Sequence, residues 1–253
     1  MSATQLETST TLGQERPIQA PTVEQLRQTQ IFRELDEPVL NQLAAMSAML
    51  SVPAGTELCR QGAPANRLLV ILDGQISLMN ATANGASAVV EVIPAGGHLL
   101  LSAVLSGMPY LMSARSVTGA QLIAVDADGL RQLLHKEISL ATAMLKAEAL
   151  DFGAIVRQVC DLKLRTTAQR LGCYLLDLTN DPASNMVNLR LPFDKRLLAA
   201  RLGCRQENLS RAFAALRGLG VETHGSRVIL HDIASLRNYA LPDNDADYET
   251  APT

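Results

Sequence analysis

The spacing of apolar and polar positions divides the chain into a strand-rich first half and a helix-rich second half. Between residues 51 and 126 the apolar runs are short and glycine separates them. Asp73-Gly74, which follows the apolar run 67–72, predicts a hairpin turn, and further turns are expected at Asn84-Gly85 and Gly96-Gly97. The expected strands span residues 56–60, 67–72, 75–80, 88–93, 113–118 and 121–126. Such spacing predicts a β-sandwich or a jelly-roll-like barrel.

Helical periodicity flanks this region on both sides. Residues 23–50 have it, with Asp36 as a candidate N-cap and Pro38 in the first turn of a restarted helix. After a short helix at 127–134, residues 135–164 predict one long helix with an apolar stripe. Such a stripe favours pairing with a second copy, although burial against its own domain is the alternative. Another helix is expected at 166–178, ended by Asn180-Asp181-Pro182.

Residues 191–231 predict two short helices, a tight turn and a β-hairpin. Gly203 ends the first helix, since glycine adopts the left-handed conformation without strain. The second helix has one apolar face at i, i+3, i+4 and i+7, formed by Leu209, Ala212, Phe213 and Leu216. Its opposite face is polar. This is a helix-turn-helix followed by a wing at 221–230, and it favours DNA binding over a plain helical hairpin.

Charge is distributed unevenly along the chain. The net charge is −3, but residues 161–240 carry 12 Lys and Arg against 7 Asp and Glu, a net +5 on an otherwise acidic body. This asymmetry is expected when one domain meets phosphates. No apolar run is long enough to span a bilayer and the N-terminus lacks a secretory signal, so we expect a cytoplasmic protein. The cysteines, at 59, 160, 173 and 204, have no metal-ligand spacing, so each is expected to be a small buried hydrophobe.

The order of these segments resembles the CRP/FNR family of bacterial transcription regulators. Four segments support this resemblance: VPAGTELCRQGAPANRLLVILDGQISLM, GGHLLLSAVLSGMPYLMSARSV, the long helix, and LAARLGCRQENLSRAFAALRGLGV with its wing. The resemblance implies an α+β chain: a cyclic-nucleotide-binding-like β-roll (jelly roll), a long dimerisation helix and a C-terminal winged helix-turn-helix. The expected segments are a disordered tail (1–25), the sensor roll (26–134), the dimerisation helix (135–164), the DNA-binding domain (165–240) and an acidic tail (241–253).

Two departures from the family pattern bear on the effector. Members that bind cyclic AMP hold its ribose with glutamate and its phosphate with an arginine-serine pair. Here these positions are Ser102, Met112 and Ser113. A phosphate buried beside Met112 would lack a cation, so cyclic AMP is disfavoured. Oxygen-sensing members carry an N-terminal cysteine cluster, and this chain has no cysteine before Cys59, which excludes that iron–sulfur centre.

The remaining feature is an apolar segment, similar to the nitric-oxide-responsive (DNR/NnrR-type) branch in which heme is thought to be the sensor. His98 is a candidate axial heme ligand there. The expected effector pocket comprises Leu99, Leu101, Ser102, Tyr110, Met112 and Ser113. Plain core packing is the alternative, and so is a surface position for His98. The other histidines, His135, His224 and His231, are expected to be structural or solvent-facing.

The family reads a TTGAT-like half-site with a Glu-x-x-Ser-Arg pattern, present here as Glu207, Ser210 and Arg211. Arginine donates two hydrogen bonds to guanine, and glutamate accepts one from cytosine. Gln206 stands where cyclic-AMP-type members have arginine, which favours the FNR-like half-site. Phosphate contacts are expected from Lys195, Arg201, Arg205 and Arg227.

The sequence therefore predicts a homodimeric regulator that binds double-stranded DNA and RNA polymerase, and not a membrane. Its control is expected to come from an effector in the roll during the response to nitric oxide or low oxygen. A ligand-independent regulator controlled by its abundance, or a cyclic-nucleotide-responsive one, is the alternative. An enzyme is not expected, because no phosphate loop, zinc pattern or nucleophile–base pair is visible.

Overall fold

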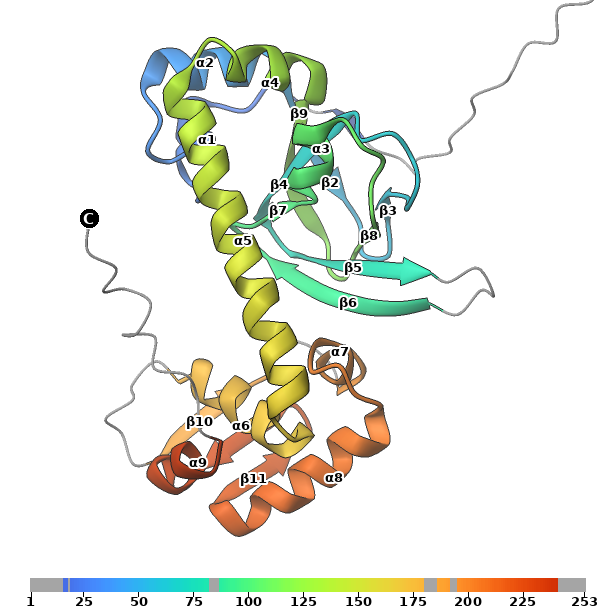
Figure 1. Ribbon diagram of the computed structural model, residues 1–253, viewed down its shortest axis with the longest axis vertical. Helices are drawn as coiled ribbons and strands as arrows, with labels where there is room; N and C mark the ends of the chain where they lie inside the picture. The colour runs from blue at the N-terminus through green and yellow to red at the C-terminus, as the bar shows by residue number, and fades with distance from the viewer. Residues whose placement is uncertain (1–15, 18, 82–86, 180–185, 192–194, 241–253) are drawn as a thin grey trace, which may run out of the picture. The chain divides into compact units, whose positions relative to one another are not determined.

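Short antiparallel strands form two sheets in the first half of the chain (Figure 1). One sheet has the strand order β1-β2-β9-β4-β7 and the other β3-β8-β5-β6. The strands are β1 (Arg16–Pro17), β2 (Ser47–Val52), β3 (Glu57–Cys59), β4 (Arg67–Asp73), β5 (Gln75–Ala81), β6 (Ser87–Pro94), β7 (His98–Leu99), β8 (Ser113–Ser116) and β9 (Ala120–Asp126). The predicted β-roll is thus confirmed.

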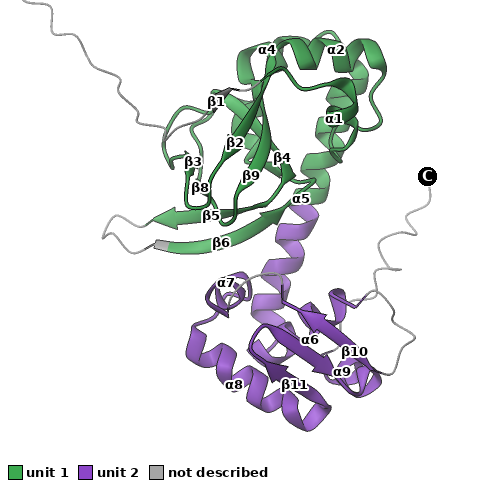
Figure 2. Ribbon diagram, turned by 180° about the vertical axis from the view of Figure 1, so that it is seen from behind, with its two compact units in different colours: residues 1–151 green, residues 152–253 purple. Residues whose placement is uncertain are grey.

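This computed structural model describes residues 16–17, 19–81, 87–179, 186–191 and 195–240. The chain forms two compact units, residues 1–151 and 152–253, coloured separately in Figure 2. The turn expected at Asn84-Gly85, the helix end at Asn180-Asp181-Pro182 and the acidic tail lie outside the described residues, as does most of the N-terminal tail.

The β-roll core is built from apolar strand residues and the helices beside them. In β4 four consecutive residues, 68–71, are fully or almost fully buried, and α3 and α4 pack near this strand. A strand covered on both faces needs an unbroken apolar run rather than an alternating one. The helices of this unit are α1 (Val23–Arg27), α2 (Glu37–Ala45), α3 (Leu101–Ser106), α4 (Ala127–Leu134) and the first part of α5 (Ile138–Leu164).

Asp73-Gly74 does not close a hairpin, contrary to the prediction. β4 pairs with β7 and β9, whereas β5 pairs with β6 and β8, so the dipeptide turns the chain from one sheet into the other. Gly74 has φ +92°, and a Cβ there would lie 2.5 Å from the carbonyl oxygen of Gly119. Both the left-handed backbone and the close approach require glycine at this corner.

The helical prediction for residues 23–50 is wrong in the middle, since α1 ends at Arg27 and residues 28–36 form no helix, and it is wrong again at its end. α2 begins after Asp36, with Pro38 in its first turn, as expected, although the Asp36 side chain makes no capping hydrogen bond. The helix stops at Ala45, and Ser47 opens β2, which pairs with β9 from Ser47↔Val125 onward. Pairing in the sheet therefore prevails over the local helical periodicity, since propensity is a weak determinant beside tertiary contacts.

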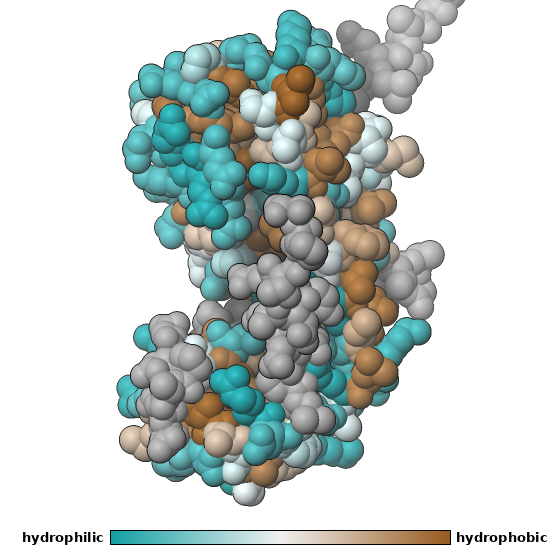
Figure 3. Space-filling view, turned by 60° about the vertical axis from the view of Figure 1, so that its left-hand side comes forward, coloured by the Kyte–Doolittle hydropathy of each residue, from teal (hydrophilic) through white to brown (hydrophobic). Residues whose placement is uncertain are grey.

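Helix α5 is continuous across the boundary between the two units. It starts at Ile138, three residues later than predicted, because His135 caps the preceding α4. Leu140, Met144 and Ala147 are buried in the core of the first unit. Nine other large apolar side chains of α5 are exposed: Ile138, Leu145, Leu150, Phe152, Ile155, Val156, Val159, Leu162 and Leu164. Hydrophobic residues are visible on the surface in Figure 3.

The second unit packs helices against a three-stranded antiparallel sheet of order β10-β12-β11. After the end of α5 its elements are α6 (Thr167–Asp177), β10 (Val187–Arg190), α7 (Lys195–Arg201), α8 (Gln206–Leu216), the 3₁₀ turn η1 (Arg217–Leu219), β11 (Val221–His224), β12 (Arg227–Leu230) and α9 (Ile233–Ala240). β11 and β12 form the predicted wing. The sequence analysis did not anticipate β1, β7, β10, α3 or α9. Among the described helices none is both long and apolar enough to cross a bilayer.

Candidate nucleic-acid interface

Helices α7 and α8 meet through a tight turn centred on Gly203. Its φ of +61° is left-handed, as expected of the residue that ends α7. A Cβ at Gly203 would lie 2.6 Å from Cδ2 of Leu162 in α5, so the turn also packs closely against the end of that helix. Arg170 of α6 donates from Nε to the carbonyl oxygen of Leu202 at 3.0 Å. The turn is thus held from two neighbouring helices.

Helix α8 buries one face and exposes the other. Leu209, Ala212, Phe213 and Leu216 belong to the core of this unit, which confirms the predicted buried face. Glu207, Ser210 and Arg211 are exposed, as is Gln206. Glu207 lies in the first turn, where a carboxylate also interacts favourably with the helix dipole.

The exposed face has few internal partners. Ser210 donates from Oγ to the carbonyl oxygen of Gln206 at 3.0 Å, which keeps the hydroxyl close to the helix backbone. The four residues predicted to contact phosphate are exposed: Lys195, Arg201, Arg205 and Arg227. The Lys195 ammonium lies 5.6 Å from the centre of the Phe213 ring, and the Arg201 guanidinium lies 5.6 Å from that of Tyr174. These cation–π contacts help to orient the two side chains.

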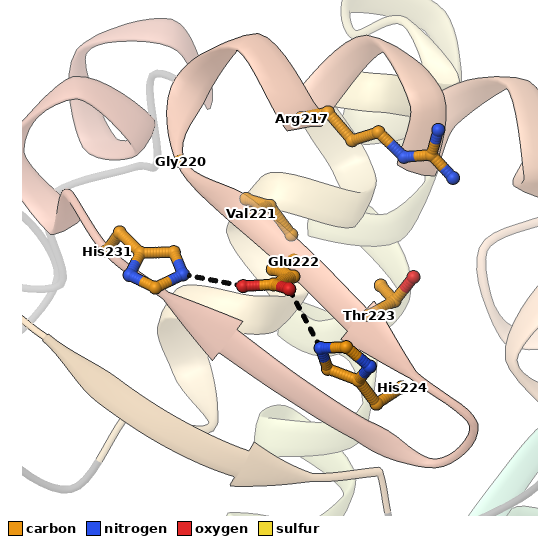
Figure 4. A pocket seen from close by; sticks show the side chains of 7 residues that line it. All are labelled: Arg217, Gly220, Val221, Glu222, Thr223, His224 and His231. Atoms are coloured by element: carbon orange, nitrogen blue, oxygen red, sulfur yellow. Dashed lines mark hydrogen bonds and ion pairs between the residues drawn. The ribbon is translucent and has the colours of Figure 1, made fainter.

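The wing carries a cluster of titratable side chains (Figure 4). Oε1 of Glu222 lies 2.8 Å from Nε2 of His224, and its Oε2 lies 3.0 Å from Nε2 of His231. The hydrogen bonds from His231 and His224 lower the pKa of the Glu222 carboxyl. All three side chains are exposed, as expected for the histidines. They line an open cavity of about 460 Å³ together with Arg217, Gly220, Val221 and Thr223.

In the roll, the predicted effector residues divide between core and surface. Leu99, Leu101 and Tyr110 are buried, and the Tyr110 hydroxyl donates to the carbonyl oxygen of Arg67 at 2.6 Å. Ser102 is exposed on α3. Leu100, which lies between Leu99 and Leu101, is the one non-glycine residue of the described chain with a positive φ, at 50°. Such backbone strain is rare and is found disproportionately at functional segments.

Met112 and Ser113 lie half-buried near β3. The backbone N–H of Gln61 donates to Ser113 Oγ at 2.9 Å, and the Cys59 thiol faces the Met112 carbonyl oxygen at 3.8 Å. Burial raises the pKa of the Cys59 thiol to about 11, so this neighbour is neutral at physiological pH. A nucleotide phosphate at Met112 would therefore find no cation at this position, although the neutral thiol beside it would not repel the phosphate.

His98 contacts a carboxylate of α5 through one of its two ring nitrogens. Its Nε2 lies 3.0 Å from Oδ2 of Asp151 in α5, and the imidazole is only 12 % exposed. Nε2 of His98 thus already faces a carboxylate, so a heme iron would have to displace Asp151 or bind the other ring nitrogen. Within the described part of the chain, no group of three His, Cys, Asp or Glu side chains is placed to hold a metal ion.

The cysteine expectation is wrong for one residue. Cys59 and Cys173 are buried and Cys204 is half-buried, but Cys160 is exposed on α5. Its position follows from the exposure of that stretch of helix. Sequence reasoning also missed Arg190, an exposed basic residue at the end of β10. The alternation of residues 187–190 was the available signal, but four residues are too few for a firm strand prediction.

Comparison with known proteins also divides the chain into an N-terminal β-roll domain and a C-terminal helix-turn-helix domain. Residues 49–137 match the family model of the cyclic nucleotide-binding domain, and residues 169–239 match that of the Crp-like helix-turn-helix domain. A solved structure from Ruegeria pomeroyi, named for cyclic nucleotide binding, is 30% identical, with a TM-score of 0.60. It covers 87% of this chain and 97% of its own.

Two curated relatives are more distant. The transcriptional regulator flp of Lacticaseibacillus casei is 23% identical and covers 83% of this chain and 95% of its own length. The CRP-like cAMP-activated global transcriptional regulator of Mycobacterium tuberculosis is 20% identical, covering 83% and 96%. The fold and the interface thus define a transcription regulator with a cyclic-nucleotide-binding-type domain and a winged helix-turn-helix. The chain belongs to the CRP/FNR family.

Proposed function

We propose that this regulator binds, as a dimer, a palindromic TTGAT-like DNA site and responds to nitric oxide or low oxygen through an effector in the β-roll. The observation that carries the proposal is the exposure of Glu207, Ser210 and Arg211 on the first two turns of α8. The N-terminal residues of a recognition helix are those that meet base edges in the major groove.

The chemistry of these side chains suits the proposed half-site. Arg211 can donate two hydrogen bonds to guanine O6 and N7, and Glu207 can accept one from the N4 amine of cytosine. The small Ser210 side chain suits a thymine methyl. Gln206, which replaces the arginine of cyclic-AMP-type members, supports the FNR-like site, and hence the nitrogen-oxide or oxygen response.

The exposed side of α5 supports the proposed dimer. Leu145, Phe152 and Val159 repeat every seven residues, and Ile155 and Leu162 follow three residues after the last two. This is the a/d pattern of a two-stranded coiled coil. Leaving so many apolar side chains in water is unfavourable, at roughly 25 cal/mol for each Å² of apolar surface, and pairing with a second copy would remove much of that cost.

Control by the roll would act through α5. Asp151 pairs with His98, and the Lys146 ammonium lies 3.9 Å from a Glu34 carboxylate oxygen, so both the sheet and the N-terminal helical segment contact this helix. An effector that binds better to one arrangement of these contacts would shift the population of helix positions in the dimer. The repositioned DNA-binding domains would then bind the DNA site with a different affinity and contact RNA polymerase differently. We place this regulation in the cytoplasm.

The decisive experiment measures binding to a duplex with two TTGAT-like half-sites one helical turn apart, beside a scrambled duplex. We expect tight binding of the palindrome by wild type and a loss of preference in Glu207→Ala. Asn208→Ala, at an exposed neighbouring position outside the reading pattern, is the matched control. Equal affinity and selectivity in Glu207→Ala and wild type would contradict the assignment.

A cyclic-nucleotide-responsive regulator is the second candidate, favoured by the family match of residues 49–137. The test is calorimetric titration with cyclic AMP. We expect no saturable binding, since Met112 offers no cation to the phosphate. Saturable binding together with tighter binding of the palindrome would establish this second candidate and remove the nitric-oxide or oxygen proposal.

A further inference from the structure

The exposed face of the three-stranded sheet carries a row of basic groups across its strands. Arg227 of β12 pairs in register with Arg190 of β10 on one side and with His224 of β11 on the other. All three side chains are exposed, at the end of the sheet next to the hairpin turn. Like charges directly opposite each other destabilise a sheet unless an anion lies between or above them.

Among the described residues, no acidic side chain forms an ion pair with Arg190 or Arg227. This face also carries an acid, Glu222, which lies on the same side of β11 as His224 because the two are two residues apart. Its carboxylate is shared between His224 and His231, at 2.8 and 3.0 Å (Figure 4). The charge of the wing therefore depends on whether these two imidazoles carry protons.

Other charges near the cluster come from three neighbouring segments. Arg217 of η1 lines the same cavity, and Arg227 pairs across the hairpin. Asp232 follows His231, but its carboxylate accepts from the backbone N–H and the hydroxyl of Ser235, at 2.9 and 2.6 Å. With both imidazoles neutral, Glu222 offsets one arginine. With both protonated, the carboxylate is outweighed and the wing becomes strongly cationic.

We propose that the His224–Glu222–His231 cluster is a proton-controlled contact for the phosphate backbone of DNA, so that the wing binds the backbone more tightly as pH falls. Imidazole is the side chain that ordinarily changes charge between about pH 5 and 8. Each added positive charge near the backbone releases condensed counterions from DNA, which strengthens binding and increases its salt dependence. Arg190 and Arg227 would hold the same phosphates at every pH.

This inference rests on the proposed DNA-binding function and adds its dependence on pH. The test measures the affinity for the palindromic duplex from pH 5.5 to 8.0 at constant ionic strength, with circular dichroism at each pH to verify folding. In wild type we expect binding to tighten about tenfold toward pH 5.5 and the salt slope to steepen. The double variant His224→Gln/His231→Gln should show an affinity that does not change with pH.

Glu222→Gln provides a second, opposite readout. It removes the negative charge near the phosphates and the anion that favours protonated imidazoles. We therefore expect this variant to bind several-fold more tightly than wild type at pH 8.0 and to gain less on acidification. His98 and His135 remain in every variant, so any response that arises from them persists in the double variant.

The outcomes separate the two proposals. If wild type does not prefer the palindrome at any pH, the proposed function fails. If it prefers the palindrome but the double variant keeps the wild-type pH response, the wing inference alone is overturned. Weaker binding by Glu222→Gln at pH 8.0 would also overturn it, since the carboxylate would then be supporting the contact rather than opposing it.

Discussion

His98 Nε2 lies 3.0 Å from Asp151 Oδ2, and this pair joins the short strand β7 to helix α5 at the last residue of the first unit. The imidazole is mostly buried while the carboxylate is half-exposed. The pair therefore fastens the edge of the roll to the helix proposed to carry the signal. It gives His98 a structural partner, whereas its role as a heme ligand stays a prediction.

The first prediction concerns heme. Because Nε2 of His98 is committed to Asp151, we expect hemin to give the same absorption spectrum with wild type and with His98→Ala, both before and after nitric oxide is added. A sharp Soret band with near-stoichiometric uptake that disappears in His98→Ala would contradict this and would restore the heme ligand. Asp151→Asn, which keeps the imidazole but removes its charged partner, shows whether the pair masks a ligand.

The second prediction concerns the dimer. Phe152 is 69 % exposed on the apolar side of α5, and in the proposed coiled coil it occupies an a position. Phe152→Asp would bury a charge at the seam, so we expect a dimer-to-monomer shift of at least tenfold in the dissociation constant. Ala154→Asp, exposed two residues further along, is the control and should stay dimeric. Analytical ultracentrifugation of both variants decides the point.

The third prediction concerns pH and Glu148. Burial, and next the Asp151 carboxylate, raise the pKa of Glu148, while His98 opposes them. A carboxyl whose pKa is higher when folded favours folding while protonated, so its contribution is lost as pH rises above about 4.3, the ordinary glutamate value. Glu148→Gln should therefore melt about 1–2 °C above wild type at pH 7 and equal it near pH 4. A constant difference across this range would exclude the carboxyl as the cause.

The fourth prediction separates base readout from phosphate contact. Arg211→Ala should weaken binding by about 1–3 kcal/mol and relax the choice of base at the guanine of the half-site. Lys195→Ala should weaken binding similarly for all sequences and lower the salt slope by about one. Fluorescence anisotropy with base-substituted duplexes at several salt concentrations measures both. If Arg211→Ala lowered affinity equally for every duplex, Arg211 would be a phosphate contact.

The local sequence pattern was sufficient to predict an element wherever that element packs against the core through one face. The residues of α8 that pack inward repeat at helical spacing, and all four are buried. Helix α4 has the predicted limits, and its N-cap Asp126 accepts from the backbone N–H of Gly129 at 2.7 Å. The β-roll was also predictable, because glycines in the turns separate the short apolar runs of the strands at regular intervals along the chain.

Pattern was insufficient wherever a distant segment decides the outcome. Asp73-Gly74 carries the residues of a hairpin turn, but β5 pairs with β6 and with β8, some forty residues away, instead of with β4, so the dipeptide forms a corner. The helical periodicity predicted for residues 23–50 overlaps Ser47–Val52, which nevertheless forms a strand against β9. The local sequence does not distinguish a hairpin from a corner in the first case, or a helix from a strand in the second.

The sequence alone determined the order of roll, long helix and winged helix-turn-helix, and the polar residues of α8 offered to DNA, because each depends on periodicity and on residues close in the chain. Tertiary structure alone decided that His98 meets Asp151, that Cys160 is exposed, and that Glu222 meets His231, beyond the end of β12. The reason is physical: these relationships depend on how sheets and helices pack, and packing brings together side chains that no spacing along the chain connects.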